Sequence, residues 1–150
     1  MEEVKVSGRV TVASNVRGSM TNTRGRYAIS GYNFELTSDG SVRSGGPGEE
    51  ASALDLLVAS LVSCALNAFR QDFVEEGHPD RQVEIFARVE RRLDGDYLGT
   101  LILECFIDDA DAKTADELIT EYKQRCRIYN ALKDSLPVVF VPHTAGAGTT

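Results

Sequence analysis

The chain has 150 residues, 42% of them hydrophobic, and this length fits a single domain, residues 1–150, with a buried core. Its 23 acidic and 16 basic residues give a formal net charge of −7, which argues against a nucleic-acid partner because no basic surface is expected to neutralise phosphates. The longest charge-free apolar stretch, residues 56–69, is shorter than the ~20 residues that cross a bilayer, and the N-terminal segment does not resemble a secretory signal. We therefore expect a cytoplasmic protein without a membrane partner.

The first part of the chain predicts strands and turns. Hydrophobic and polar residues alternate from Val4 to Val12, which is the period of a half-buried strand. Residues 15–24 are polar and predict a loop. Residues 26–29 and 32–36 lie on either side of the Ser30-Gly31 pair and predict a hairpin with its turn at that pair.

The middle of the chain predicts a flexible loop followed by a long helix. Residues 38–48 include four glycines and predict the loop. Ser52 can cap the first turn of the helix, Asp55 can complete a capping box, and Gly77 marks the end. Apolar side chains point in nearly every direction of the helical wheel, so we expect other elements to surround this helix: Leu54, Leu56, Leu57, Val58, Leu61, Val62, Leu66, Phe69 and Phe73.

A hairpin is predicted after the long helix. Apolar residues alternate with charged or polar ones over residues 83–89 and 101–107, and Asp94-Gly95 is a turn signal between the two segments. One face of this antiparallel hairpin is expected to be buried. Cys105 lies in phase with the apolar residues of the second strand and is interpreted as part of the core.

The C-terminal part predicts a second helix and a last strand. Thr114 and Glu117 can form a capping box. The apolar residues that follow have the spacing of an amphipathic helix, which predicts that Cys126 points inward near the helix end. Residues 138–141 can add a strand, and the tail from about residue 142 to 150 has a loose composition. The predicted order is β-β-β-α-β-β-α-β, which is an α+β fold.

Two further cysteines, Cys64 in the long helix and Cys126 in the second helix, are candidates for chemistry. No cysteine belongs to a CxxC pair or lies near a histidine at metal-ligand spacing, so the sequence indicates neither a metal nor a cofactor. His78 and His143 are interpreted as solvated and have no assigned role. From the residues alone, packing in the core and a reactive role both remain open for Cys64 and Cys126.

Two motifs resemble those of a known family. Residues 52–64, SALDLLVASLVSC, resemble the pattern S-P-x-[ED]-L-L-L-A-S-L-x-x-C of the OsmC/Ohr family, and residues 126–132, CRIYNAL, resemble its pattern C-P-[IV]-x-x-x-L. The order of the predicted elements and the length of residues 65–125 between the cysteines also fit. The resemblance implies a long buried central helix against antiparallel sheet, and an intertwined homodimer with active sites at the subunit interface.

The resemblance also implies a thiol-dependent peroxidase that reduces organic hydroperoxides. In that chemistry the Cys64 thiolate attacks a peroxide oxygen and becomes a sulfenic acid. Cys126 then condenses with it to a disulfide, and an external dithiol reductant restores both thiols. No metal or cofactor takes part.

An arginine and an acid flank the reactive cysteine in peroxidases of the family. The acid of the organic-hydroperoxide branch falls on Leu54 here, whereas the OsmC-like branch has its acid at the position of Asp55, so the chain resembles the latter. Capping and an active-site role are both open for Asp55. Arg43, 21 residues before Cys64, is the favoured arginine. The reserve candidates are Arg24 and Arg26, and Arg17 is a fourth arginine in this part of the chain.

The chain departs from the family pattern directly after the second cysteine. The family usually has a proline there, which breaks a helix, and this chain has Arg127. Without the proline the helix can run on past Cys126. The added cation can lower the pKa of Cys126, and a solvent-facing arginine is the other interpretation.

Other functions remain open beside the peroxidase. The first is a non-catalytic module that binds a hydrophobic small molecule and in which the cysteines are incidental. Others keep the thiol pair but use it as a redox sensor, or act as a hydrolase. Titration of the thiols separates these functions, since a binding module is expected to have two inert buried thiols.

Overall fold

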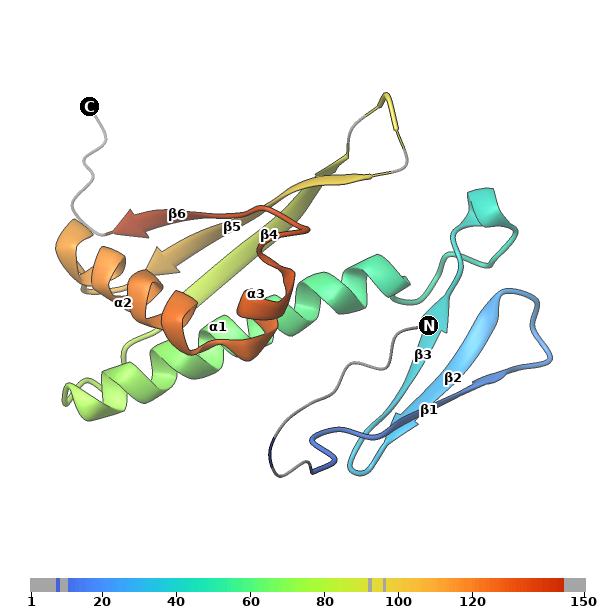
Figure 1. Cartoon of the computed structure of the whole chain (residues 1–150), viewed down its shortest axis with the longest axis horizontal. Helices are drawn as coiled ribbons and strands as arrows, with labels where there is room; N and C mark the ends of the chain where they lie inside the picture. The colour runs from blue at the N-terminus through green and yellow to red at the C-terminus, as the bar shows by residue number, and fades with distance from the viewer. Residues whose placement is uncertain (1–7, 9–10, 92, 96, 145–150) are drawn as a thin grey trace. The chain divides into compact units, whose positions relative to one another are not determined.

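The structure, a computed structural model, describes residues 8, 11–91, 93–95 and 97–144. The chain forms two compact units, residues 1–55 and residues 56–150, and the helix α1 begins in the first and continues in the second (Figure 1). The predicted α+β class is confirmed.

The first unit contains a three-stranded antiparallel sheet in the order β1-β2-β3, formed by Val16–Met20, Arg26–Gly31 and Glu35–Asp39. The predicted loop at residues 15–24 is therefore wrong in its first half, because β1 pairs with β2 although its sequence, VRGSM, has no apolar alternation. The predicted strand from Val4 to Val12 lies largely outside the described residues, and Val12 itself is exposed and belongs to no strand.

The turn of the β2–β3 hairpin is not at the predicted Ser30-Gly31 pair. Ser30 pairs with Glu35 inside the ladder, and the Gly31 N–H donates to the Phe34 carbonyl at 2.9 Å. A side chain on Gly31 would collide with the ring of Phe34. This glycine is thus required by the close approach of an aromatic ring at the end of the strand, and the turn follows it at residues 32–34.

Residues after β3 fold back onto the sheet instead of forming a flexible loop. Asp39, at the end of β3, accepts two hydrogen bonds of 2.8 Å from Arg26 and two more from the backbone N–H groups of Glu49 and Glu50. Arg26 also pairs with Glu49 at 2.8 Å. The Arg26 guanidinium holds the pKa of Asp39 far below its usual value. A short 3-10 helix, η1, spans Val42–Ser44 within this segment.

The helix α1, Ala53–Glu75, has both of the predicted end signals. The Asp55 carboxylate accepts from the Ser52 N–H at 2.8 Å, and the Ser52 hydroxyl accepts from the Asp55 N–H at 3.1 Å, which is a capping box. At the other end Gly77 has φ 81° and donates to the carbonyl of Val74, while His78 donates to that of Phe73.

Only one face of α1 is fully buried in the single chain, by Leu61, Ala65, Phe69, Asp72 and Phe73. Val74 on the opposite side is 56% exposed and Leu66 at the edge of the buried face is 37% exposed, so a single chain does not surround this helix as predicted. Among the described residues, α1 is also the one helix whose length and composition would suffice to cross a membrane, a criterion that core helices of soluble proteins meet as well.

The second unit contains a mixed sheet in the order β4-β5-β6, with helices on one of its faces (Figure 1). β4, Val83–Arg91, and β5, Leu98–Ile107, form the predicted antiparallel hairpin. β6, Val138–Thr144, pairs in parallel with β5, so this sheet is not purely antiparallel. The core lies between the sheet and the helices and includes Ala65, Phe69, Phe73, Leu103, Cys105, Ile107, Ala115, Leu118, Ile119, Tyr122 and Cys126.

The last strand is longer than predicted. β6 includes residues 142–144, which were expected to begin a loose tail, because His143 pairs with Phe106 and their rings stack at 4.4 Å with an angle of 6°. The rest of the predicted tail, residues 145–150, lies outside the described residues.

The helix α2, Ala112–Arg125, begins three residues earlier than predicted. Its N-cap is Asp111, whose carboxylate accepts from the Thr114 N–H at 2.7 Å. The predicted capping box of Thr114 and Glu117 is therefore wrong, and Glu117 instead pairs with Lys113 at 3.7 Å. Asp111, three residues before Thr114, is the stronger cap because its short carboxylate reaches the free N–H groups directly.

The helix α2 ends at Cys126, and a new helix, α3, follows at Arg127–Leu132. The expectation that the helix runs on without the proline is wrong. Cys126 is extended, with ψ 110°, and the Asn130 side-chain amide donates to the carbonyls of Lys123 and Cys126 at 3.0 Å each. Asn130 thus donates to the Lys123 carbonyl at the end of α2 and to the Cys126 carbonyl that begins α3, so it bridges the break where the family has a proline.

Candidate functional site

The structure brings Cys64 and Cys126 together. Cys64 lies in the middle of α1, and Cys126 lies at the junction of α2 and α3, both in the second unit. Their sulfur atoms are 2.6 Å apart, and both are free thiols. Cys126 is 4% exposed and Cys64 is half-buried, so a disulfide between them requires only a small movement of the side chains.

The two thiols differ in acidity. Burial raises the pKa of Cys64, and the contact with the Cys126 sulfur raises it further, to about 12. Burial also opposes ionisation of Cys126, but the Cys64 thiol, the Tyr122 hydroxyl and two backbone N–H groups of α3 favour its thiolate, and its pKa lies below the usual value. Of the two thiols, Cys126 is therefore the one that ionises more readily.

Cys126 is held by the backbone on both sides. Its N–H donates to the Tyr122 carbonyl at 2.8 Å, and its sulfur accepts from the Tyr129 N–H at 3.3 Å, so that Cys126 closes α2 and caps α3. This double role fixes the sulfur toward α1. Because the site depends on the helix break at Cys126, Asn130 contributes to it without touching either sulfur.

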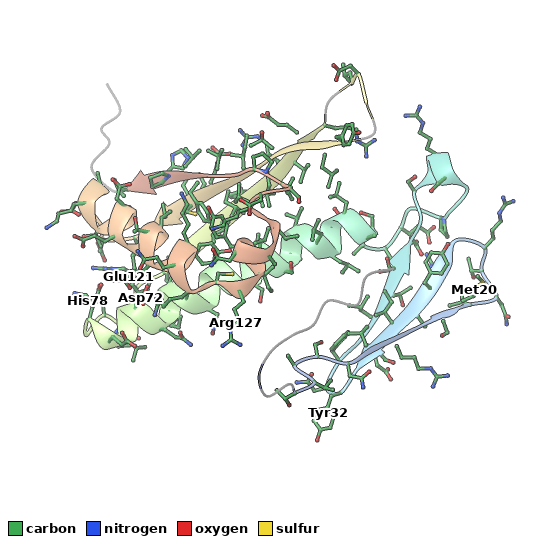
Figure 2. The ribbon with its side chains drawn as sticks, viewed as in Figure 1. Met20, Tyr32, Asp72, His78, Glu121 and Arg127 are labelled. Carbon is green, nitrogen blue, oxygen red and sulfur yellow. The ribbon has the colours of Figure 1, made fainter. Side chains whose placement is uncertain are left out.

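An ion pair ties the end of α2 to α1 beside the cysteines. Arg125, directly before Cys126, donates to the carboxylate of Asp72, which is 3% exposed. Arg125 also pairs with Glu121 at 3.5 Å, and Figure 2 shows Asp72 and Glu121 on facing sides of the two helices. The second carboxylate oxygen of Asp72 has no partner in the described part of the chain. Asp72 therefore depends on Arg125 for compensation of its charge.

Cys105 has the surroundings of an inert thiol. It is fully buried on β5, its sulfur contacts the Leu103 carbonyl at 3.8 Å, and burial raises its pKa to about 12. The interpretation of Cys105 as part of the core is confirmed.

The predicted supporting residues Arg43 and Asp55 belong to the first unit. Asp55 is held in the capping box, where the Ser52 N–H and hydroxyl lower its pKa. Arg43 is exposed in η1, and the described residues provide it with no ion pair. Of the other arginines, Arg26 is fully engaged by Asp39 and Glu49.

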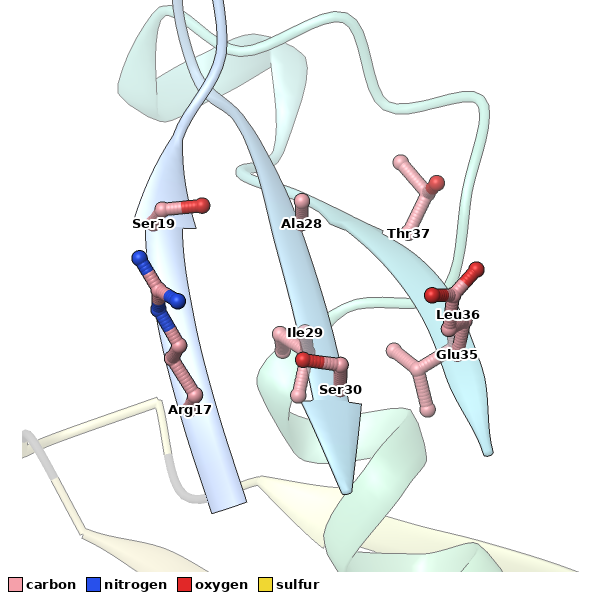
Figure 3. A pocket seen from close by; sticks show the side chains of 8 residues that line it. All are labelled: Arg17, Ser19, Ala28, Ile29, Ser30, Glu35, Leu36 and Thr37. Atoms are coloured by element: carbon pink, nitrogen blue, oxygen red, sulfur yellow. The ribbon is translucent and has the colours of Figure 1, made fainter. Parts of the chain in front are cut away.

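A shallow pocket of about 450 Å³ lies on the sheet of the first unit (Figure 3). All three strands contribute to it, and Arg17 is its one basic side chain. The residues that line it are Arg17, Ser19, Ala28, Ile29, Ser30, Glu35, Leu36 and Thr37. Met20 and Tyr32, labelled in Figure 2, lie at opposite ends of the same sheet and are largely exposed. No cluster of metal-ligating side chains occurs within the ranges that the structure describes.

Sequence reasoning missed Tyr122, the Asp72–Arg125 pair and Asn130. A signal was present for two of them. Tyr122 lies four residues before Cys126 and so on the same helix face, and Asp72 is a charged residue within the apolar stripe of α1. The role of Asn130 depends on the helix break, which no local pattern indicated.

The chain combines an α+β fold with a pair of neighbouring thiols, one on a long central helix and one at the junction of two helices. These features place it among proteins with a paired-cysteine site. The chain belongs to the OsmC-like family, since the family model described as OsmC-like protein matches residues 46–140. This confirms the resemblance seen in the two cysteine motifs. No curated protein matches the sequence.

Solved structures share the fold over nearly the whole chain. An OsmC-like protein from Mycoplasma pneumoniae has 13% identity and a TM-score of 0.75, with 91% of this chain and 99% of that chain covered. An organic hydroperoxide resistance protein OsmC from Legionella pneumophila has 15% identity and a TM-score of 0.67, with 89% and 98% covered. The organic hydroperoxide resistance protein OhrB of Bacillus subtilis has 16% identity and a TM-score of 0.63, with 88% and 98% covered.

Proposed function

We propose that the protein is a thiol-dependent peroxidase that reduces organic hydroperoxides through Cys64 and Cys126. The observation that supports this most is the 2.6 Å separation of two free thiols at the second unit's core. Two structures with the same fold are named organic hydroperoxide resistance proteins, and the chain belongs to the OsmC-like family. Both findings support an organic hydroperoxide as the substrate.

The proposed cycle follows from thiol chemistry. The Cys64 thiolate attacks a peroxide oxygen, the O–O bond breaks, and the alkoxide takes up a proton and leaves as the alcohol. Cys64 is now a sulfenic acid, with which Cys126 forms a disulfide. An external dithiol then reduces the disulfide, and no metal or cofactor is required.

Mapping of the oxidised thiols tests this function. Reduced protein is treated with one equivalent of an organic hydroperoxide and digested, and the disulfide-linked peptides are identified. We expect a Cys64–Cys126 bond with Cys105 still free, because Cys105 is fully buried and burial raises its pKa to about 12. Consumption of peroxide without this bond, or first oxidation at Cys105, contradicts the proposal. Two thiols that remain inert instead favour the binding module.

Arg43 is proposed as the cation that favours the Cys64 thiolate and orients the peroxide, with Asp55 as the accompanying acid. A cation is needed because the pKa of Cys64 is raised in the reduced pair. Arg43→Ala is expected to lower the rate of peroxide reduction by about tenfold or more, with a stability change within about 0.5 kcal/mol, as for other exposed positions. Arg88→Ala, which also removes an exposed arginine, serves as control in the peroxidase assay. An unchanged rate in Arg43→Ala would transfer the role to Arg24 or Arg26.

We also propose that the chain is a homodimer, because the exposed side of α1 carries apolar residues that a single chain leaves in water. Val74, opposite the buried face of α1, is 56% exposed, and Leu66, at the edge of that face, is 37% exposed. Sedimentation at micromolar concentration is expected to show twice the chain mass of 16.4 kDa. A monomer at all accessible concentrations would contradict this proposal.

A further inference from the structure

We propose that Asn130 is a positioning residue for the resolving thiol, which holds the helix break at Cys126 and keeps the Cys126 sulfur beside Cys64, in place of the proline of the family pattern. This inference rests on the proposed peroxidase cycle and assigns a residue to its second step. Asn130 lies four residues after Cys126, at a position where the second cysteine motif demands no particular residue.

The end of α2 leaves a carbonyl that needs a donor. In a continuous helix the Lys123 carbonyl would accept from the N–H of Arg127, four residues later. Cys126 is extended instead, with φ −74° and ψ 110°, so the chain turns away before that bond can form. The side-chain amide of Asn130 donates to the Lys123 carbonyl at 3.0 Å and thus replaces the missing N–H.

Two donors of Asn130 meet at the Cys126 carbonyl. The Asn130 backbone N–H donates to this carbonyl at 3.0 Å, and the side-chain amide donates to it at 3.0 Å as well. A carbonyl oxygen has two lone pairs, so Asn130 engages both. The carbonyls of Lys123 and Cys126 are acceptors only, which requires the amide nitrogen of Asn130, and not its oxygen, to face them. Asn130 therefore clamps the last turn of α2 to the start of α3.

This clamp acts on the Cys126 sulfur through the backbone of the same residue. The Cys126 carbonyl is held by Asn130, and the Cys126 N–H is held by the Tyr122 carbonyl at 2.8 Å. The sulfur in turn accepts from the Tyr129 N–H at 3.3 Å and lies 2.6 Å from the Cys64 sulfur. Release of the carbonyl would let the peptide at the break rotate, and the sulfur would then lie away from Cys64 for part of the time.

A proline at position 127 reaches the same geometry by another route. Proline fixes its own φ, lacks the N–H that a continuous helix needs, and disfavours a helical conformation in the residue before it. Cys126 already has the extended conformation that a following proline demands, and position 127 is the first residue of α3, where proline fits well. Arg127→Pro is therefore compatible with the structure and should make Asn130 dispensable.

The consequence falls on the step in which the disulfide forms. The Cys126 thiolate attacks the sulfur of the Cys64 sulfenic acid, the S–S bond forms and the S–O bond breaks. The hydroxide that leaves takes up the proton that Cys126 released on ionisation and becomes water. Two thiols held side by side react at a high effective concentration, so a loosened Cys126 slows this step and weakens the disulfide.

The equilibrium of the Cys64–Cys126 disulfide with glutathione tests the role of Asn130. Protein in a Cys105→Ala background is equilibrated at neutral pH with mixtures of reduced and oxidised glutathione, and mass spectrometry measures the fraction with the intramolecular disulfide. Oxidised glutathione takes up the two electrons and two protons of the dithiol and becomes two molecules of reduced glutathione. Asn130→Ala is expected to lower the equilibrium constant for disulfide formation about tenfold, a shift of about 30 mV to higher potential. A change that destabilises the dithiol and disulfide forms equally leaves this constant unchanged.

Rescue by proline separates positioning from a general loss of stability. Arg127→Pro added to Asn130→Ala is expected to restore the wild-type constant, and Arg127→Pro alone to leave it unchanged. Gln124→Ala is the matched control, because it removes an exposed side-chain amide from the same end of α2. Asn130→Asp keeps the shape of the side chain but places carboxylate oxygens against carbonyl oxygens, so it is expected to lower the constant at least as far as Asn130→Ala.

In the peroxide reaction, Asn130→Ala is expected to lengthen the lifetime of the Cys64 sulfenic acid about tenfold, and Arg127→Pro to restore it. A glutathione constant that Asn130→Ala leaves unchanged overturns the inference, and so does a loss that Arg127→Pro fails to recover or that Gln124→Ala shares. Failure of the peroxidase proposal is distinguishable because no peroxide enters the glutathione equilibrium. The wild type would then consume no hydroperoxide, while the glutathione constant would still respond to Asn130.

Discussion

Replacement of Cys64 by serine is expected to abolish both peroxide turnover and the disulfide, because a hydroxyl cannot form the sulfenic acid on which the cycle depends. Turnover is measured with an organic hydroperoxide and a small dithiol as reductant. We expect a loss of at least 1000-fold, on the order of 4 kcal/mol of transition-state stabilisation. Cys105→Ala is the matched control, since it removes a thiol from the same core and should leave turnover unchanged.

Cys126→Ser is expected to fail in a different way. Cys64 should still react once with peroxide, but its sulfenic acid then has no resolving thiol within reach. With excess peroxide it should proceed to the sulfinic acid, which mass spectrometry detects as a further added oxygen. If Cys64→Ser and Cys126→Ser exchanged these outcomes, the order of attack in the pair would be the reverse of the one proposed.

The second large effect is expected in stability, from Arg125→Ala. This change leaves the buried carboxylate of Asp72 without its partner. Loss of one member of a fully buried pair costs about 3–5 kcal/mol, and we expect about 2–3 kcal/mol here because Arg125 itself is 43% exposed. Urea unfolding measures the change through the transition midpoint.

Two further variants identify the cause of that loss. Asp72→Asn combined with Arg125→Ala should recover part of the stability, because the uncompensated charge is removed. Arg88→Ala breaks an ion pair with Glu104 in which both side chains are substantially solvated, so it should cost less than about 1 kcal/mol. Equal losses in Arg125→Ala and Arg88→Ala would show that burial of Asp72 does not determine the effect.

The fold was predictable where a pattern is local and strong. The alternation in β4 and β5 and the Ser52–Asp55 capping box lie within a few residues of each other, and both predictions are confirmed. β1 was missed because its strand character comes from pairing with β2 and not from its own side chains. The misplaced hairpin turn has a similar cause, since the packing of Phe34 against Gly31 is not visible as a turn signal.

The site was predictable only as far as its motifs reached. The pairing of Cys64 with Cys126 came from the family resemblance, and the structure places the two sulfurs together. The groups that set the acidity of the pair come from three helices, and their contacts depend on how the helices pack. The α3 backbone groups could therefore not be assigned from spacing alone, whereas the spacing of Tyr122 from Cys126 places both on one helix face.

The helix break at Cys126 also bears on how relatives of this chain are recognised. A sequence pattern that demands proline after the second cysteine passes over chains that reach the same geometry by another route. Here Asn130, four residues after Cys126, donates to the Lys123 carbonyl of α2 and to the Cys126 carbonyl, and the position after the cysteine holds a charged residue. A search that accepts Cys-x-x-x-Asn beside Cys-Pro would gather such chains.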